Sequence, residues 1–369
     1  MNGALEGLLV IALEQAVAAP YCTRQLADGG ARVIKLERVG GETARHYDRV
    51  VNGASAYFAW LNRGKESLVL DVKDADDRAL VERMAARADV FIQNNAPGAA
   101  ARLGLDAAAL VARFPALIAV DICGYGQTTD ARNMRAYDML VQAETGLCSV
   151  TGSDEAMAKV GVSVADIATG MNAHAAILEA LIARGRTGKG RAIEIAMFDC
   201  LADWMAVPLL HYEQGGQRTG RHGIEHASVY PYAPFACRDG AVMLSVQSPD
   251  EWRRLCGGVL GEAGLADDPR FADNPARVRN RLVLGALIAG VFRDWSVVEA
   301  IARLEEHRIA WGRVSEIEDF ASHAALRRIT VPVGGKPVHM PRPAGRCGAE
   351  GGAVPALDAH GAALRAEFR

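Results

Sequence analysis

One carboxylate in this chain stands where covalent chemistry is possible. Asp166 directly precedes a segment whose side chains repeat at helical spacing. The resulting stripe consists of Ile167, Met171, His174, Leu178 and Leu181. A carboxylate at a helix start commonly caps the helix. The same position also keeps a carboxylate ionised, because the helix N-terminus is partly positive, and an ionised carboxylate can act as a nucleophile. The pattern leaves these two compatible roles open for Asp166.

Histidines and glycines supply further candidate groups. His174 lies on the helical stripe, where it is either a packed core residue or a base. Gly215-Gly216-Gln217 and Gly220 belong to a glycine-rich stretch whose backbone N–H groups could stabilise an oxyanion from a lid. The alternative is a flexible connection between domains. His222 and His226 flank this stretch and could contact a substrate, but no pattern assigns them a role.

The spacing of potential ligands gives no support to metal or redox chemistry. The seven cysteines include no C-x-x-C pair, and the nine histidines form no H-E-x-x-H pattern. We therefore expect no metal site and a reducing compartment. The G-x-G-x-x-G phosphate fingerprint is missing after the first expected strand, where Gln15-Ala-Val-Ala-Ala-Pro20 stands instead. This argues against a nicotinamide-dependent oxidoreductase.

The composition is ordinary for a globular chain. Its 369 residues are 50% hydrophobic and 23% charged, with a net charge of −3. That is enough material for a core and for two domains. The small negative net charge gives no positive field, so we expect no nucleic-acid partner. No apolar run approaches the roughly 20 residues that cross a membrane, and the opening stretch does not look like a secretory signal. We expect a cytoplasmic protein without membrane contact.

The elements that must position Asp166 follow an α/β rhythm. Apolar runs of strand length alternate with helical segments, which predicts a parallel sheet of a kind that can be doubly wound. The expected strands are Leu8–Leu13, Ala31–Glu37, Ser67–Val72, Val90–Asn94, Ala116–Ile122, Val160–Val164 and Ala192–Ala196. The clearest helices are expected at Asp74–Arg87 and after Asp166.

The composition changes between about residues 206 and 230, where glycine and polar residues replace the apolar runs. Beyond this stretch we expect a hairpin over Tyr232–Val246, with its turn at Asp239-Gly240, and then helices up to about residue 322. The predicted fold class is therefore α/β. Residues 1–205 and 325–369 form a large Rossmann-like domain, and residues 206–324 form a smaller α+β domain with its linkers.

Short motifs then follow one another in a fixed order through the first half of the chain. They include Ala19-Pro-Tyr-Cys-Thr23, Val33-Ile-Lys-Leu-Glu-Arg38, Leu61-Asn-Arg-Gly-Lys65, Ala88-Asp-Val-Phe-Ile-Gln-Asn94, Tyr137-Asp138 and Val164-Ala-Asp-Ile-Ala-Thr-Gly170. Each motif is weak alone, but the series resembles the family III CoA-transferases. This is the CaiB/BaiF family, which includes formyl-CoA and carnitine CoA-transferases. Weaker similarity continues at Glu251-Trp-Arg-Arg-Leu255 and Asp268-Pro-Arg-Phe271.

The resemblance implies an enzyme that moves coenzyme A (CoA) from an acyl-CoA thioester to a free carboxylic acid. At the family's nucleophile position this chain has Asp166. Its carboxylate would attack the thioester to form a mixed anhydride, and the CoA thiolate would then form an aspartyl-CoA thioester. No permanently bound cofactor is implied, because CoA is a substrate. Similarity at Ser149–Gly152 and Arg221-His222 favours a short dicarboxylic or branched acid as the acceptor.

The resemblance also implies where CoA binds. CoA carries three phosphate groups, which bind basic side chains and backbone N–H groups. The corresponding positions are Arg38, Lys65, Asn94, Arg102, Arg135 and Tyr137. Each basic residue taken alone could equally be a solvated surface charge. The family further implies a homodimer in which two ring-like chains interlock.

The chain departs from the family pattern in places, and alternatives stay open. Ala19 replaces the usual glycine before the proline, and Gln93-Asn94-Asn95 replaces the common Glu-Asn-Phe. One alternative on the same fold is an acyl-CoA racemase or epimerase, although the family's racemases have a histidine where this chain has Tyr137. A second alternative is a non-catalytic CoA-binding protein, which would have no need to keep Asp166.

Overall fold

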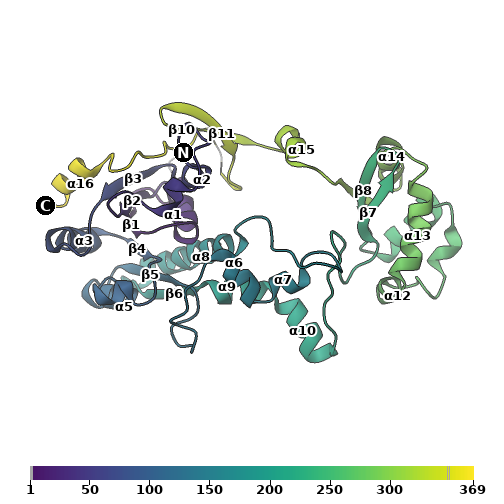
Figure 1. Ribbon diagram of the computed structural model, residues 1–369, viewed down its shortest axis with the longest axis horizontal. Coiled ribbons are helices and arrows are strands. Elements are labelled where there is room, and N and C mark those ends of the chain that lie inside the picture. Colours follow the sequence, from purple (N-terminus) through teal and green to yellow (C-terminus); the bar gives the residue numbers. More distant parts are fainter. Residues whose placement is uncertain (1–2, 347, 349) are drawn as a thin grey trace. The chain divides into compact units, whose positions relative to one another are not determined.

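The structure is a computed structural model that describes residues 3–346, 348 and 350–369 (Figure 1). The chain divides into two compact units. The first comprises Met1–Leu147, Val160–Val207 and Arg327–Arg369, and the second comprises Cys148–Lys159 and Pro208–Leu326. These units differ from the predicted domain boundaries chiefly at residues 148–159, which group with the second unit, whereas the prediction places them in the large domain.

A parallel sheet forms the centre of the first unit. Within the described residues it has six strands in the order β3-β2-β1-β4-β5-β6. The strands are β1 Leu9–Leu13, β2 Arg32–Glu37, β3 Lys65–Val69, β4 Val90–Gln93, β5 Ile118–Cys123 and β6 Ala192–Ala196. Strands that are buried on both faces read as continuous apolar runs, as Val10-Ile11-Ala12 does. The sheet confirms the predicted α/β class, and its order reverses direction between β1 and β4.

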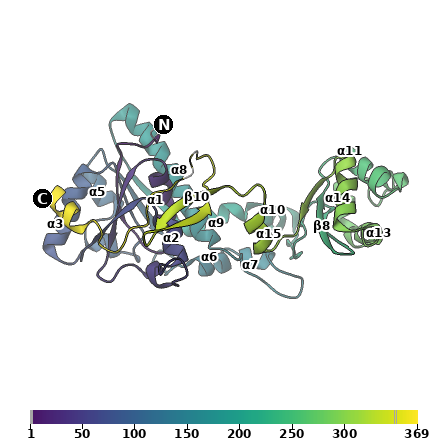
Figure 2. The same ribbon diagram turned by 90° about the horizontal axis from the view of Figure 1, so that it is seen from above.

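Helices cover both faces of this sheet (Figures 1 and 2). Val10 and Ala12 of β1 point to the face covered by α1 and α8, whereas Ile11 points to the face covered by α3, α5 and α16. The alternation follows from the two-residue period of a strand. The bounds of these helices are α1 Ala18–Asp28, α3 Ala75–Arg87, α5 Ala107–Arg113, α8 Val164–Thr187 and α16 Gly361–Glu367.

Helix α8 approaches α1 closely because small residues line the contact. A Cβ atom added to Gly170 would lie 2.6 Å from the carbonyl oxygen of Ala18 and 2.9 Å from the Cβ of Tyr21. Glycine at this position therefore sets the distance between the two helices. It thereby sets the position of α8, the helix that carries Asp166.

The buried face of α8 differs from the predicted stripe. Met171 is 51% exposed, whereas Ala173, Ile177 and Ala180 are buried. The prediction followed the larger apolar side chains. The helix instead packs through its alanines and glycine, which allow the closer approach to α1.

The C-terminal segment returns to the edge strand β3. The backbone N–H of Val69 donates to Asp358 Oδ1 at 2.8 Å, and that of Ser67 donates to His360 Nδ1 at 3.1 Å. A hairpin of β10 (Arg328–Val333) and β11 (Lys336–Pro341) packs its apolar face on Ala59 of α2 (Ala56–Asn62). The first unit is thus built from both ends of the chain.

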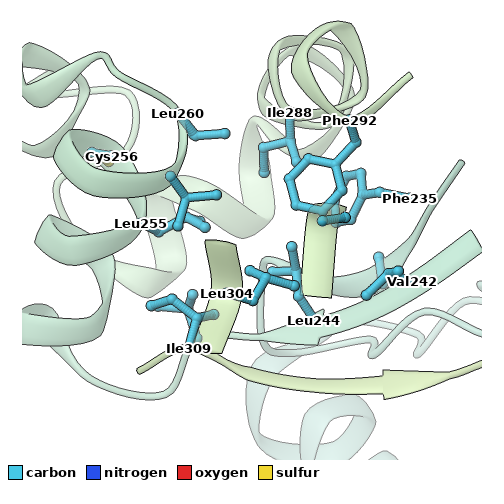
Figure 3. Packing of buried hydrophobic residues seen from close by; sticks show 14 of the residues in the cluster. Phe235, Val242, Leu244, Leu255, Cys256, Leu260, Ile288, Phe292, Leu304 and Ile309 are labelled. Carbon is cyan, nitrogen blue, oxygen red and sulfur yellow. The ribbon is translucent and has the colours of Figure 1, made fainter. Parts of the chain in front are cut away.

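The second unit contains an antiparallel sheet in the order β7-β8-β9, packed against helices. Its core brings Phe235, Val242 and Leu244 of the strands against Ile288 and Phe292 of α13 (Figure 3). The predicted hairpin is confirmed, because Cys237 pairs with Gly240 across the expected turn. The strands are β7 Tyr232–Cys237, β8 Gly240–Ser245 and β9 Ala310–Arg313.

The remaining helices complete the two units. They are η1 Thr43–His46, α2 Ala56–Asn62, α4 Ala99–Arg102, α6 Asp138–Glu144, α7 Leu147–Val150, α9 Met197–Trp204, α10 Ala206–Gly215, α11 Pro249–Arg254, η2 Leu255–Val259, η3 Ala263–Ala266, α12 Asn274–Arg279, α13 Arg281–Phe292, α14 Val297–Glu306 and α15 Ile317–Ser322. The predicted strand at Val160–Val164 is wrong, because α8 already begins at Val164. Among the helices that the structure describes, none has the length and apolarity to span a bilayer.

Candidate active site

The carboxyl ends of β1, β2 and β3 surround a cavity of about 130 Å³. Gln15, Arg38 and Asn95, which follow three of the sheet's strands, are among the residues that line it. Gln15 and Asn95 bring the cavity to the border between β1 and β4, where the strand order reverses. In doubly wound sheets this is the usual place for a ligand, because the loops diverge there and leave a crevice.

The loop after β1 is held in an uncommon conformation beside this cavity. Ala16 has a φ of 59°, a left-handed value that costs energy for any residue with a Cβ. Its backbone N–H donates to Glu42 Oε2 at 2.8 Å. Asn94 holds the neighbouring residue through both ends of its amide. Its Oδ1 accepts from the Gln15 N–H at 2.9 Å, and its Nδ2 donates to the Gln15 carbonyl at 2.8 Å. Asn94 therefore fixes the loop.

Asp166 is the third residue of α8 and does not cap it. The residue at the N-cap position is Ser163, whose side chain makes no capping hydrogen bond. The acceptor comes from α6 instead, because Asp138 Oδ1 accepts the N–H of Ala165 at 2.8 Å and that of Asp166 at 3.3 Å. Asp138 thus satisfies N–H groups that lack a partner within the helix. The predicted capping role of Asp166 is wrong, and its carboxylate is not committed to its own helix end.

The surroundings of Asp166 make its carboxyl group unusual. Burial, and then the negative charge of Asp138, raise the pKa of Asp166 to about 7. Two carboxylates close together disfavour each other's ionisation, and burial disfavours the charged form further. Perturbed carboxyl groups of this kind are characteristic of functional sites.

Aromatic residues lie close to Asp166. Burial raises the pKa of Tyr47, and the charges of Glu42 and Asp166 raise it further. The rings of Tyr47 and Tyr57 meet edge to face with their centres 5.6 Å apart, and the Tyr57 hydroxyl is 3.4 Å from Ser163 Oγ. Glu42, which lines the cavity, also accepts the N–H of Ala44 at the start of η1. The segment from Glu42 to Tyr47 therefore connects the cavity with the neighbourhood of Asp166.

The surroundings of Lys65 argue against its predicted contact with CoA. Its side chain is fully buried, and its Nζ lies 2.7 Å from Glu14 Oε1, 3.0 Å from Asn62 Oδ1 and 3.2 Å from the Pro20 carbonyl oxygen. Lys35 joins the same buried cluster through Glu14 and Glu42, at 3.4 and 3.0 Å. The Lys65 ammonium group therefore binds Glu14 in the loop after β1 and is not available to a phosphate.

The other predicted CoA-binding residues are accessible. Arg38 is exposed at the cavity, where its Nε donates to the Gly41 carbonyl at 2.9 Å. Arg102 is exposed at the end of α4, which follows β4. Arg135 is exposed, and Tyr137, 68% exposed, immediately precedes Asp138. The structure thus places Arg38 at the cavity and Arg135 and Tyr137 beside the aspartate that contacts α8.

Two further residues of the site were missed at the level of sequence. Asp138 was noted only as part of a motif, and Glu42 was not considered. Asp138 stands at the start of an apolar segment, a place where carboxylates often act as caps, and this signal was available. No local signal identifies Glu42, because its partner Ala16 lies 26 residues away in sequence.

The candidate groups of the second unit are engaged in local contacts. Arg221 donates to the carbonyl oxygens of Ser153 and Asp154 at 2.7 and 2.9 Å. His222 Nδ1 is 3.1 Å from Arg281 Nη1, and His226 Nδ1 accepts two backbone N–H groups while its ring stacks on Tyr232. Gly215 lies inside α10, so the predicted connection is partly helical. Among the described residues, no group of three or more His, Cys, Asp or Glu side chains is placed to hold a metal ion.

A doubly wound sheet with a perturbed carboxyl group near its carboxyl edge defines an α/β enzyme class, and comparison with known proteins identifies the family. The family model of CoA-transferase family III matches residues 5–358. The acetyl-CoA:oxalate CoA-transferase of Acetobacter aceti is 35% identical over 377 residues, which cover 100% of this chain and 96% of that protein. The succinate–glutarate CoA-transferase of Agrobacterium fabrum is 35% identical, with 85% and 81% covered.

A solved structure agrees with these relatives. The crystal structure of a CaiB/BaiF family protein from Brucella suis is 33% identical, covers 100% of both chains and superimposes with a TM-score of 0.83. The chain therefore belongs to the family III CoA-transferases. It is an enzyme that transfers CoA between an acyl-CoA and a carboxylic acid, which confirms the predicted class.

Proposed function

We propose that Asp166 is the covalent nucleophile of this CoA-transferase. The observation that carries the proposal is its carboxyl group in the first turn of α8, next to Asp138, with a pKa raised to about 7. A carboxylate of higher pKa is a stronger base and, with it, a stronger nucleophile. Near neutral pH, a substantial fraction of Asp166 is still ionised and ready to attack.

The reaction then proceeds through acyl-enzyme species that balance in atoms and charge. The Asp166 carboxylate attacks the thioester carbonyl, the C–S bond breaks, and a mixed anhydride and CoA thiolate result. The thiolate attacks the Asp166 carbonyl, which releases the donor acid and leaves an aspartyl-CoA thioester. The acceptor carboxylate attacks this thioester to give a second anhydride. The thiolate takes the new acyl group and restores Asp166.

CoA would bind across the carboxyl ends of the strands, with only part of the molecule in the cavity of about 130 Å³. Arg38 lines that cavity, and Arg102 and Arg135 are exposed on neighbouring segments where they can reach phosphate groups. Asn94 contributes by fixing the loop of Gln15 and Ala16. Tyr137 precedes Asp138 and would contact the reacting end of the substrate. CoA acts as a substrate in this scheme, and no permanent cofactor takes part.

A short dicarboxylic acid is the proposed acceptor. The relatives described above are named for oxalate and for succinate and glutarate, and a succinyl-CoA:mesaconate CoA-transferase of Haloarcula hispanica is 31% identical over 392 residues. All of these acids carry two carboxylates. Arg221, the sequence-based candidate for the second carboxylate, is occupied by backbone carbonyls, so we assign it no such contact. A panel of mono- and diacids with succinyl-CoA, read by mass spectrometry of the thioester products, tests this choice.

We also propose a homodimer of interlocked chains. Helix α10 has no buried residue, and Val207, Leu209, Leu210 and Tyr212 are all more than half exposed. An apolar helix surface of this kind calls for a covering partner, and a second copy of the chain is the proposed one. Analytical ultracentrifugation that finds only a 39.3 kDa species at micromolar protein would contradict the dimer.

The remaining expectations stay proposals. The six described free cysteines suit a reducing compartment, which supports a cytoplasmic location. Domain boundaries near residues 205 and 325 also stay a prediction.

Trapping of the enzyme-bound acyl group tests the nucleophile directly. Wild-type protein is incubated with acyl-CoA, quenched with hydroxylamine and digested. We expect a hydroxamate on the peptide that contains Val164–Gly170, because hydroxylamine attacks an activated aspartyl carbonyl. The label should be absent in Asp166→Asn. A hydroxamate on another peptide, or near-normal transfer by the Asp166→Asn enzyme, would exclude the proposed role.

A further inference from the structure

Four buried side-chain nitrogens without a hydrogen-bond partner belong to residues around the C-terminal half of α1. Among the described residues six buried side-chain nitrogen or oxygen atoms lack such a partner. The four are Nε of Arg24, Nε2 of Gln25, Nε2 of His174 and Nε of Arg342. A buried donor without an acceptor costs about 1–3 kcal/mol, so such groups rarely occur together. Of the four residues, Arg342 lines a cavity in which an acceptor could bind.

Arg346 connects these residues. Its Nη2 donates to the backbone carbonyl of Gln25 at 3.3 Å. Burial, and then the charges of Arg346 and Arg24, lower the pKa of His174. Arg24 is only 6% exposed, and the charge of Arg63 adds to the burial that lowers its pKa. The groups therefore share one electrostatic environment.

A cavity of about 340 Å³ opens beside them. Its lining includes Arg63, Arg342 and Arg346. It also includes several glycines, among them Gly64 and Gly351, which have no side chain to fill the space. Arg63 is already satisfied, since its Nε and Nη2 donate to the two carboxylate oxygens of Asp28 at 3.0 and 2.6 Å. Arg342 and Arg346 are thus the cations that a ligand in the cavity would meet.

The charges of the described residues around this cavity do not balance. Three arginines, Arg63, Arg342 and Arg346, line it against two carboxylates, those of Asp28 and Glu350. The excess is one positive charge, and the buried Arg24, whose pKa is lowered by burial and then by the charge of Arg63, adds a second one nearby. Buried charges need partners, and guanidinium groups pair best with the oxygens of carboxylate or phosphate.

The cavity is separate from the proposed active site. It is lined by Asp28 at the end of α1 and by Gly64, which precedes β3, and therefore lies towards the amino ends of the strands. Gln15 and Asn95, which line the other cavity, follow the carboxyl ends of β1 and β4.

We propose that this second cavity binds a small molecule through an oxyanion, a phosphate or carboxylate group, held by Arg342 and Arg346. Its volume of about 340 Å³ is at the lower end for small-molecule sites, so the ligand is an organic acid or phosphate and not a whole CoA. The inference does not depend on the role of Asp166.

The test uses the full chain saturated with CoA, so that the CoA phosphate positions are already filled. Inorganic phosphate and succinate are each titrated at millimolar concentration and followed by isothermal titration calorimetry. We expect saturable binding of at least one. Because succinate is also a short dicarboxylic acid of the kind proposed as acceptor and can bind at the active site, only binding that is weakened in the arginine variant identifies the group. In Arg342→Gln/Arg346→Gln the affinity should fall about tenfold or more, because charged hydrogen bonds are lost. Arg253→Gln, on an exposed helix of the second unit, should bind as wild type does.

Two further measurements distinguish ligand binding from a purely structural role of the two arginines. The double variant should unfold no earlier than wild type without anion, because an unsatisfied donor has been removed. If it fails to fold, Arg342→Gln alone carries the test. CoA transfer by the variant should be unchanged, so failure here leaves the proposed function untouched. Absence of saturable binding, or equal affinity in the variant, would overturn the proposal. Loss of a dimer in the variant would also overturn it, because a carboxylate of a second copy would then be what fills the cavity.

Discussion

The carboxylate of Asp138 accepts the backbone N–H of Asp166 at 3.3 Å, so one aspartate caps the N-terminus of the helix that carries the other. The second oxygen of Asp138 accepts from Gln142 Nε2 at 2.7 Å, which fixes its orientation. These contacts hold the Asp138 carboxylate in place at the start of α8. Its charge, after burial, raises the pKa of Asp166. The same contact positions the proposed nucleophile and tunes it.

This relationship predicts the pH dependence of the enzyme. Attack requires the carboxylate form of Asp166, so kcat/KM should rise with pH through an inflection near the pKa of about 7. In Asp138→Asn the inflection should move to lower pH, because the variant lacks the charge that disfavours the Asp166 carboxylate. A pH–rate profile of both proteins with one acyl-CoA measures the shift.

The choice of asparagine separates charge from capping. Asparagine keeps a side-chain oxygen that can accept from α8, whereas Asp138→Ala loses this acceptor and should also lose about 1 kcal/mol of stability. An unchanged inflection in Asp138→Asn would show that Asp138 does not tune the nucleophile.

Asp166 should also reduce the stability of the folded protein at alkaline pH. Because its pKa is raised on folding to about 7, the folded chain holds the proton more tightly than the unfolded chain does. The resulting stabilisation is complete below the unfolded pKa and is lost as the pH rises through the folded pKa. Asp166→Asn, which never ionises, should therefore be more stable than wild type at pH 8, by on the order of 2 kcal/mol.

Urea unfolding at two pH values checks this expectation. The advantage of Asp166→Asn should shrink as the pH falls from 8 towards 4. A wild type that is the more stable protein at pH 8 would mean that Asp166 is ionised at no cost in the folded state.

The sequence predicted the sheet well because its central strands are buried. Runs such as Val90-Phe91-Ile92 must be apolar whatever they pack against, so composition alone identifies them. The start of α8 and its buried face were predicted less well. They depend on Asp138, on the small residues of α1 and on the close approach at Gly170, none of which a local pattern records.

Lys65 shows the same limit at the level of the site. Its position after Asn62-Arg63-Gly64 matched the family motif, but its partner Glu14 lies 51 residues away in sequence. Only the fold shows that the ammonium group is used internally. Arg38, which has no carboxylate partner among the described ion pairs, lines the cavity, and its contact with CoA stays a prediction.

Two substitutions should therefore separate core ion pairs from substrate contacts. Lys65→Met leaves the buried Glu14 carboxylate without its nearest cationic partner and should cost about 3–5 kcal/mol of stability. Glu14→Gln in the same chain should restore part of the loss. Arg38→Gln should leave stability within about 0.5 kcal/mol and raise the KM for acyl-CoA. Urea unfolding and steady-state kinetics give the two readouts, and a stable Lys65→Met enzyme with a raised KM would reinstate Lys65 as a CoA contact.

Two glycines on one helix provide a matched test of how α8 is placed. A Cβ on Gly170 would lie 2.6 Å from the Ala18 carbonyl oxygen, a backbone atom that cannot move alone, so Gly170→Ala should force α8 away from α1. We expect a loss of about 1–3 kcal/mol, typical of overpacking. A Cβ on Gly185, also in α8, meets nothing within 4 Å, so Gly185→Ala should stabilise the helix by up to about 1 kcal/mol. Since α8 begins beside Asp166, only Gly170→Ala should also slow CoA transfer. Urea unfolding and initial rates of both variants decide the matter. If the two alanines behaved alike, the close α1–α8 contact would not be what positions Asp166.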